Sequence, residues 1–116
     1  MNAIRGAGAA LLLAALAGCV GTQPDNPALV EARQTYTRVS ADPVAVRNAP
    51  LEVRRAEEAL RRAEAAQAQR VNTNEVSHLS YLATRQAQIA QEVGALKEAR
   101  DAIAAAGLRR GPAGWR

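Results

Sequence analysis

The feature that most constrains the fold is a line of mostly aliphatic residues in the C-terminal part of the chain. It consists of Leu79, Leu82, Gln86, Ile89, Val93, Leu96, Arg100 and Ile103. Their spacings alternate between three and four, which places them on one face of an α-helix as a coiled-coil-like seam. The pattern predicts one long helix that ends near Ala106 and turns this face toward other helices.

Cap signals flank the predicted long helix. Asn72, with Glu75 three residues later, resembles a capping box, so residues 71–74 are expected to form the turn before the helix. Gly107 is a natural C-cap, and Pro112 prevents the helix from continuing.

Two shorter helices are predicted upstream, and both open on a proline. Asn26 is a favourable N-cap, and Pro27 fits the first helical position, where a missing N–H costs nothing. Pro50 opens the second helix, and Pro43 is expected to break the first, leaving residues 41–49 as a loop. The apolar lines of the two helices are Leu29, Ala32, Tyr36 and Val39, and Val53, Ala56, Leu60 and Ala63.

The composition limits the core that these helices can form. The 116 residues include no Phe, and large apolar side chains are sparse while Ala is abundant. We expect a thin core in which Tyr36 and Tyr81 stack. The predicted fold class is all-α: a small antiparallel helical hairpin or a three-helix bundle with a long third helix, formed by residues 26–106, after a cleaved signal helix.

The predicted helices differ in length, so the long one cannot be fully covered. At 1.5 Å per residue the three span roughly 20, 30 and 50 Å. Leu96 and Ile103 therefore overhang unless the first helix or another chain covers them. The alternative is that the last turns fray and expose Ala-rich helix to water. Gly94 either permits another backbone to approach the long helix closely or is a tolerated weakness, costing about 1 kcal/mol relative to Ala.

Residues 1–18 have the features of a secretory signal peptide. Arg5 and the amino terminus supply positive charge, and residues 7–16 form an apolar run too short to span a bilayer, which needs about 20 residues. Leu-Ala-Gly-Cys at positions 16–19 resembles the lipobox of bacterial lipoproteins. The resemblance implies lipidation of the Cys19 sulfur, with fatty acids such as palmitate, and cleavage just before Cys19.

Lipidation would make residues 19–25 a short tether close to the membrane. Several acyl chains together make such attachment effectively permanent. Val20 implies sorting to the outer membrane, with the protein facing the periplasm. The alternative is an ordinary signal peptide with an incidental Cys. Because Cys19 is the only Cys, an intramolecular disulfide is excluded.

The basic charge lies largely in the tail. The net charge is +4, and Arg109, Arg110 and Arg116 contribute much of it. Export argues against nucleic acid as a ligand of this basic tail. The remaining candidate ligands are anionic lipid headgroups and envelope polymers, and the alternative is a solvated basic surface with no ligand. Residues 107–116 are expected to be a flexible tail whose Trp115 suits a membrane interface or belongs to a disordered terminus.

Candidates for chemistry are few, so no catalytic, cofactor or metal site is predicted. His78 follows Glu75 by three residues and is the only histidine, which favours a structural role near the helix start over a metal pair. Ser77 and Ser80 lie near His78, but adjacent positions on a helix point in different directions. We expect a protein that is not an enzyme.

Three groups of residues, in this order and spacing, resemble a known family. They are Asn26-Pro27-Ala28-Leu29 with Ala32-Arg33 and Tyr36, Ala49-Pro50-Leu51-Glu52 with Ala56, Leu60 and Ala63, and His78-Leu79-Ser80-Tyr81-Leu82-Ala83 with Ile89-Ala90. Over residues 26–100 they are similar to the domain of unknown function 4398, which implies proteobacterial envelope lipoproteins, often ahead of an OmpA-like peptidoglycan-binding domain. We expect no OmpA-like domain in this chain, so peptidoglycan binding is left open. The family implies no catalytic residues.

These features together predict a lipid-anchored periplasmic helical protein with a binding or structural role in the cell envelope. One alternative is a self-assembling coiled-coil element that pairs through the seam of the long helix. Another is an accessory subunit of an envelope complex with an OmpA-like partner.

Overall fold

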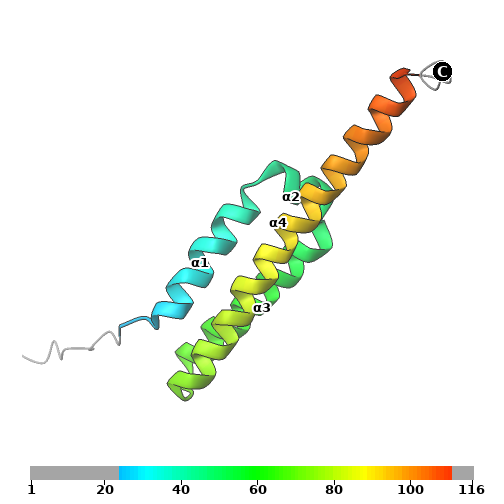
Figure 1. Cartoon of the computed structure of the whole chain (residues 1–116). Helices are drawn as coiled ribbons and strands as arrows, with labels where there is room; N and C mark the ends of the chain where they lie inside the picture. The colour runs from blue at the N-terminus through cyan, green and yellow to red at the C-terminus, as the bar shows by residue number, and fades with distance from the viewer. Residues whose placement is uncertain (1–23, 111–116) are drawn as a thin grey trace, which may run out of the picture.

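The computed structural model describes residues 24–110 and confirms the all-α fold class (Figure 1). The expected signal peptide and Cys19 lie outside these residues. Within the described range there is no strand, and there are four helices: α1 (Pro27–Ser40), α2 (Pro43–Asn48), α3 (Pro50–Ala68) and α4 (Thr73–Arg110). Helices α1, α3 and α4 form a bundle in which the last helix is much the longest.

Helices α1 and α4 begin at the same end of the bundle and run in the same direction (Figure 1). The side-chain Nδ2 of Asn26 donates to Ser77 Oγ at 2.9 Å and to the Thr73 carbonyl at 3.4 Å, which joins the two helix starts. Helix α3 runs antiparallel to α4 and reaches it through a short turn. The predicted cap of α4 forms there, because Asn72 Oδ1 accepts from the Asn74 N–H at 2.8 Å.

The core between the helices is made mostly of alanine. One cluster joins the turn end of the three long helices, and a second lies nearer α2; Tyr36 packs against both. The buried members are Leu29, Ala32, Ala59, Leu60, Ala63 and Ala83 in the first cluster, and Val39, Ala45, Ala56, Ala87 and Ala90 in the second. The predicted apolar lines of α1 and α3 are confirmed.

The prediction for the core face of α4 is wrong. The buried residues of this helix are Val76, Ser80, Ala83, Thr84, Ala87, Ala90 and Gly94. Leu79 is partly buried against the first cluster, but the rest of the aliphatic seam faces solvent. The physical reason is that both α1 and α3 pack on α4, and a face of small residues lets two backbones come close at once. Tyr81 is 58% exposed, so the expected stack with Tyr36 in the core is also wrong.

Two predicted boundaries are also corrected. Residues 41–49 are not a loop, because they contain α2, whose start is capped by Asp42 Oδ1 accepting from the Val44 N–H at 2.9 Å. Gly107 is not a C-cap, because α4 continues through it to Arg110. Residues 107–110 of the expected tail are therefore helical, and the remainder of that tail lies outside the described residues.

Candidate functional site

The most distinctive surface of the described chain is a row of aliphatic side chains along α4. Leu82, Ile89, Leu96 and Ile103 recur every seven residues and are between 42% and 72% exposed. We call these four residues the α4 stripe. Seven-residue spacing keeps side chains on one side of a supercoiled helix over its whole length. Single exposed aliphatic residues need no explanation, but a row in register is typical of a contact surface.

The first half of the α4 stripe forms one wall of a shallow groove between α3 and α4. Leu82 and Ile89 lie in this groove, opposite residues of α3. The charged residues lining it are Arg55, Glu58, Arg62 and Arg85, so its rim is net positive. The groove thus has an apolar wall on α4 and a mostly basic rim.

The second half of the α4 stripe projects beyond the bundle. In Figure 1 the C-terminal part of α4 extends past α2 with no other helix beside it. Residues 99–110 are all exposed except Ala105, which is half-buried. We call residues 99–110 the overhang. The predicted overhang of the long helix is therefore confirmed, while the predicted fraying is not seen, since helix continues to Arg110.

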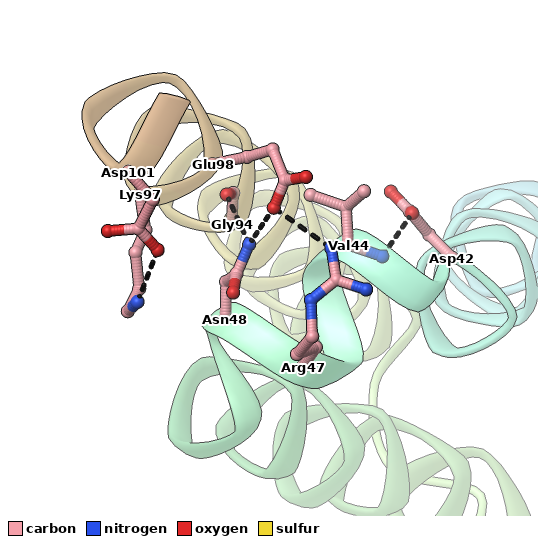
Figure 2. A network of polar contacts seen from close by, with 8 residues as sticks. All are labelled: Asp42, Val44, Arg47, Asn48, Gly94, Lys97, Glu98 and Asp101. Carbon is pink, nitrogen blue, oxygen red and sulfur yellow. Dashed lines mark hydrogen bonds and ion pairs between the residues drawn. The ribbon is translucent and has the colours of Figure 1, made fainter. Parts of the chain in front are cut away.

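Helix α2 clamps α4 just before the overhang begins. A Cβ on Gly94 would lie 2.8 Å from Ala45 Cα, which is too close for any side chain, so only glycine permits this approach of α2. Of the two interpretations of Gly94, close backbone approach is the correct one. Asn48 Nδ2 donates to the Gly94 carbonyl at 3.3 Å and to Glu98 Oε2 at 2.8 Å (Figure 2).

Glu98 receives two donors from α2 at this clamp. Figure 2 shows Asn48 and Arg47 both directed at its carboxylate, and the Arg47–Glu98 ion pair measures 2.9 Å. The hydrogen bond from Asn48, followed by the hydrogen bond and positive charge of Arg47, lowers the pKa of Glu98 from its ordinary value. The Arg47–Glu98 ion pair is exposed, so it positions α4 more than it stabilises the fold.

The opposite end of the bundle fixes where the chain enters. Arg33 on α1 forms ion pairs with Asp25 at 2.7 Å and with Glu64 of α3 at 2.9 Å. The hydrogen bond with Glu64 raises the pKa of Arg33, and burial opposes this effect. The hydrogen bond with Asp25 and its negative charge raise the pKa further. Asn26 is buried and bonded to Ser77. The entering chain is therefore held beside the turn between α3 and α4.

The residues considered for chemistry are not brought together. His78 is exposed, and residues 24–110 contain no group of three or more His, Cys, Asp or Glu that could hold a metal. Ser77 bonds Asn26, whereas Ser80 is fully buried and its Oγ has no hydrogen-bond partner among the described residues. Cys19 and Trp115 lie outside the described residues. Close approach of a backbone at Gly94 was one of the two interpretations, but its partner α2 was missed because residues 41–49 were expected to be a loop.

Comparison with protein families gives a match to the domain of unknown function DUF4398 over residues 27–106. The chain belongs to this family. The DUF4398 match begins at the first residue of α1, covers all four helices and includes most of the overhang. The projecting part of α4 is thus inside the DUF4398 region rather than an appendage to it.

Searches of curated proteins and of solved structures gave no match. Among residues 24–110, none of the helices combines the length and the apolar character needed to cross a bilayer.

Proposed function

We propose that this protein is a lipid-anchored helical protein of the bacterial outer membrane that faces the periplasm and acts by binding rather than catalysis. The observation that carries the proposal is the sequence Leu-Ala-Gly-Cys at positions 16–19, which follows a signal-peptide-like segment. It stands only a few residues before the entry of the chain into the bundle. Lipidation explains a single Cys at this position better than redox chemistry does.

The geometry of the described residues is compatible with such an anchor. The chain enters beside the turn between α3 and α4, where Arg33 holds Asp25 and Asn26 holds the start of α4. A tether of residues 19–25 reaches at most about 25 Å at 3.3–3.6 Å per residue, so this end of the bundle stays near the membrane. Helix α4 then carries the overhang away from the entry point by roughly 55 Å at 1.5 Å per residue.

A binding role is supported by the exposed aliphatic residues of α4 and the groove beside them. The α4 stripe is an exposed aliphatic row, and beyond Glu98 no other described part of the chain lies beside it. The groove between α3 and α4 is shallow, and its aliphatic residues Leu82 and Ile89 belong to the same row. An elongated surface of this type suits a protein helix better than a small substrate.

Lipid attachment is tested by feeding cells an alkyne-labelled fatty acid and comparing wild type with Cys19→Ser. Wild type should take up label and sediment with outer membranes, and the variant should do neither. Ser77→Cys in the Cys19→Ser background is a control for a thiol elsewhere, and it should remain unlabelled. Label in the Cys19→Ser variant, or fully soluble wild type, contradicts the proposal.

A second candidate role is an accessory subunit of an envelope complex with an OmpA-like partner. It is favoured by the overhang, which places a DUF4398 surface away from the anchored end. A photo-crosslinking residue at Ile103 should capture that partner from intact cells, and one at Ala105 should not. Equal capture at both positions, or none at either, contradicts this role.

A further inference from the structure

We propose that the α4 stripe is a pairing surface for the α4 stripe of a second copy of this chain, oriented parallel in the same membrane; the parallel orientation rests on the proposed lipid anchor. The surface is Leu82, Ile89, Leu96 and Ile103. The occupant is the same four residues of the second copy.

The spacing of the α4 stripe favours a helix as its occupant. Two helices stay in contact over many turns when apolar residues occupy two positions of a seven-residue repeat; the α4 stripe fills one of these positions throughout, and Val93 fills the other once. The row of four residues spans three such repeats, from Leu82 to Ile103. Beside its second half stand Ala99 and Ala106, both exposed and small enough to let a second helix approach closely.

Charge around the α4 stripe favours the parallel arrangement. With the stripe at the d positions of a parallel two-stranded coil, Glu92 falls at g and Lys97 at the next e, and these positions face each other between chains. Glu92 of each copy would then form an ion pair with Lys97 of the other copy, which gives two such ion pairs in a symmetric dimer. Both residues are exposed, and Lys97 would exchange its partner within the chain, Asp101, for Glu92 of the second copy.

The antiparallel arrangement is disfavoured by like charges. If two stripes crossed antiparallel at Leu96, Arg110 of one copy would fall beside Leu82 of the other. That part of the groove is rimmed by Arg55, Arg62 and Arg85. Anchoring adds a second reason, because both copies enter their bundles at the same end and would leave one membrane in the same direction.

Four partly exposed aliphatic residues make a small interface, so the pair should be weak in dilute solution. Two chains held in one membrane meet at a much higher effective concentration than free chains do. Pairing is therefore expected to depend on surface density, and the experiment uses the full-length chain in membranes.

Disulfide formation between single engineered cysteines tests the pairing. Lipidated Cys19 has no free thiol, so Leu96→Cys, Ile103→Cys and Ala105→Cys each add one reactive group. Ala105 is the matched control, because two residues along a helix correspond to a rotation of about 200°. In membranes treated with a mild oxidant, both Leu96→Cys and Ile103→Cys should form dimers roughly tenfold or more faster than Ala105→Cys.

Each outcome decides between arrangements. Dimers at both positions support the parallel pair; dimers at Leu96→Cys alone indicate an antiparallel crossing and overturn it. Rates equal to that of Ala105→Cys also overturn it. A fast crosslink of either cysteine to a different protein would show that another partner occupies the stripe, and would overturn it as well.

A second variant tests the pairing by placing charge within it. Ile103 is 72% exposed, so Ile103→Glu should fold normally while placing two like charges in the pair, and Ala105→Glu is its control. In the Leu96→Cys chain, the interchain crosslink should be lost when Ile103→Glu is added and kept when Ala105→Glu is added. Persistence of that crosslink contradicts the proposal.

The proposed anchor and the proposed pairing can be contradicted independently of each other. Label uptake without stripe crosslinks leaves the anchor standing and removes the pair. If label is not taken up, but Leu96→Cys and Ile103→Cys both form more dimer than the chain with no engineered cysteine, the pair is supported and the anchor is contradicted.

Discussion

Three small residues of α4 lie in different surroundings. Gly94 lies against the backbone of α2, with the Val44 carbonyl oxygen 3.2 Å from where a Cβ would stand. Gly107 has open space around it. Ser80 occupies a fully buried place in an otherwise alanine-rich face. Each position allows a stability prediction with a matched control.

Replacing Gly94 by alanine should destabilise the fold. The added methyl group would overlap backbone that cannot move aside easily, at a cost of about 1–3 kcal/mol that exceeds the helix-propensity gain. Gly107→Ala meets no neighbour and should leave stability equal or raise it by up to about 1 kcal/mol. Urea unfolding followed by circular dichroism measures both. An unchanged midpoint for Gly94→Ala would show that α2 is not packed there.

Replacing Ser80 by alanine should stabilise the fold by about 1 kcal/mol. Its hydroxyl is buried without a partner among the described residues, and a buried unpaired polar group costs about 1–3 kcal/mol. Ser77→Ala is the control and should destabilise, because Ser77 Oγ accepts from Asn26. Thermal unfolding of the two variants should therefore shift in opposite directions. A shift downward for Ser80→Ala would contradict this account of the core.

Glu98 should titrate below its ordinary pKa of 4.5, because Asn48 and Arg47 donate to its ionised form. A pKa lowered by folding means that ionised Glu98 stabilises the fold; this contribution is complete above pH 4.5 and is lost as the pH falls through the folded-state value. Asn48→Ala should raise the pKa toward 4.5, as followed by NMR of the side-chain carboxyl. Lys97→Ala should not, since Lys97 pairs with Asp101 instead.

The starts of the helices follow from local chemistry, and the packing of α4 does not. Asn26-Pro27 and Pro50 mark real helix starts, and Asp42-Pro43 carries the same cap-and-proline signal that opens α2. That signal was interpreted as a break because residues 43–48 are too few to show an apolar period. A cap followed by proline therefore marks a start even where the helix is short.

The register of α4 could not be chosen from the period of its large aliphatic residues. Its aliphatic row and its small-residue row both repeat at helical spacing, but only the small row allows α1 and α3 to approach together. The period identified the helix and its length, and the overhang of Leu96 and Ile103 followed from length alone. Of the candidate surface, the exposure of Leu96 and Ile103 was thus predicted, and that of Leu82 and Ile89 was not.

Shortening α4 tests how independent the overhang is. A chain that ends at Glu98 should unfold with a free energy within about 0.5 kcal/mol of wild type, because the overhang is almost wholly exposed. It should also lose the interchain crosslinks at the α4 stripe. Leu29→Ala, at a fully buried site, is the contrasting control and should lose about 2–5 kcal/mol. A large loss on shortening would mean that the overhang stabilises the bundle.

As a whole molecule, the chain is a short bundle with one projecting helix. Its entry point and its overhang lie at opposite ends (Figure 1). This separation gives the two proposals different locations: attachment at the entry end, and contact along the α4 stripe toward the far end. The basic pair Arg109 and Arg110 also lies at the far end, where it would meet the anchoring membrane only if the molecule lay flat.

The central claim is attachment through Cys19, and intact mass spectrometry of the protein extracted from membranes tests it most directly. We predict a chain that begins at Cys19, lacks residues 1–18 and carries the added mass of a diacylglyceryl group on that residue. Base hydrolysis should remove the ester-linked acyl chains and shift the mass by their sum. An unmodified chain, or one cleaved at any other position, would contradict the account.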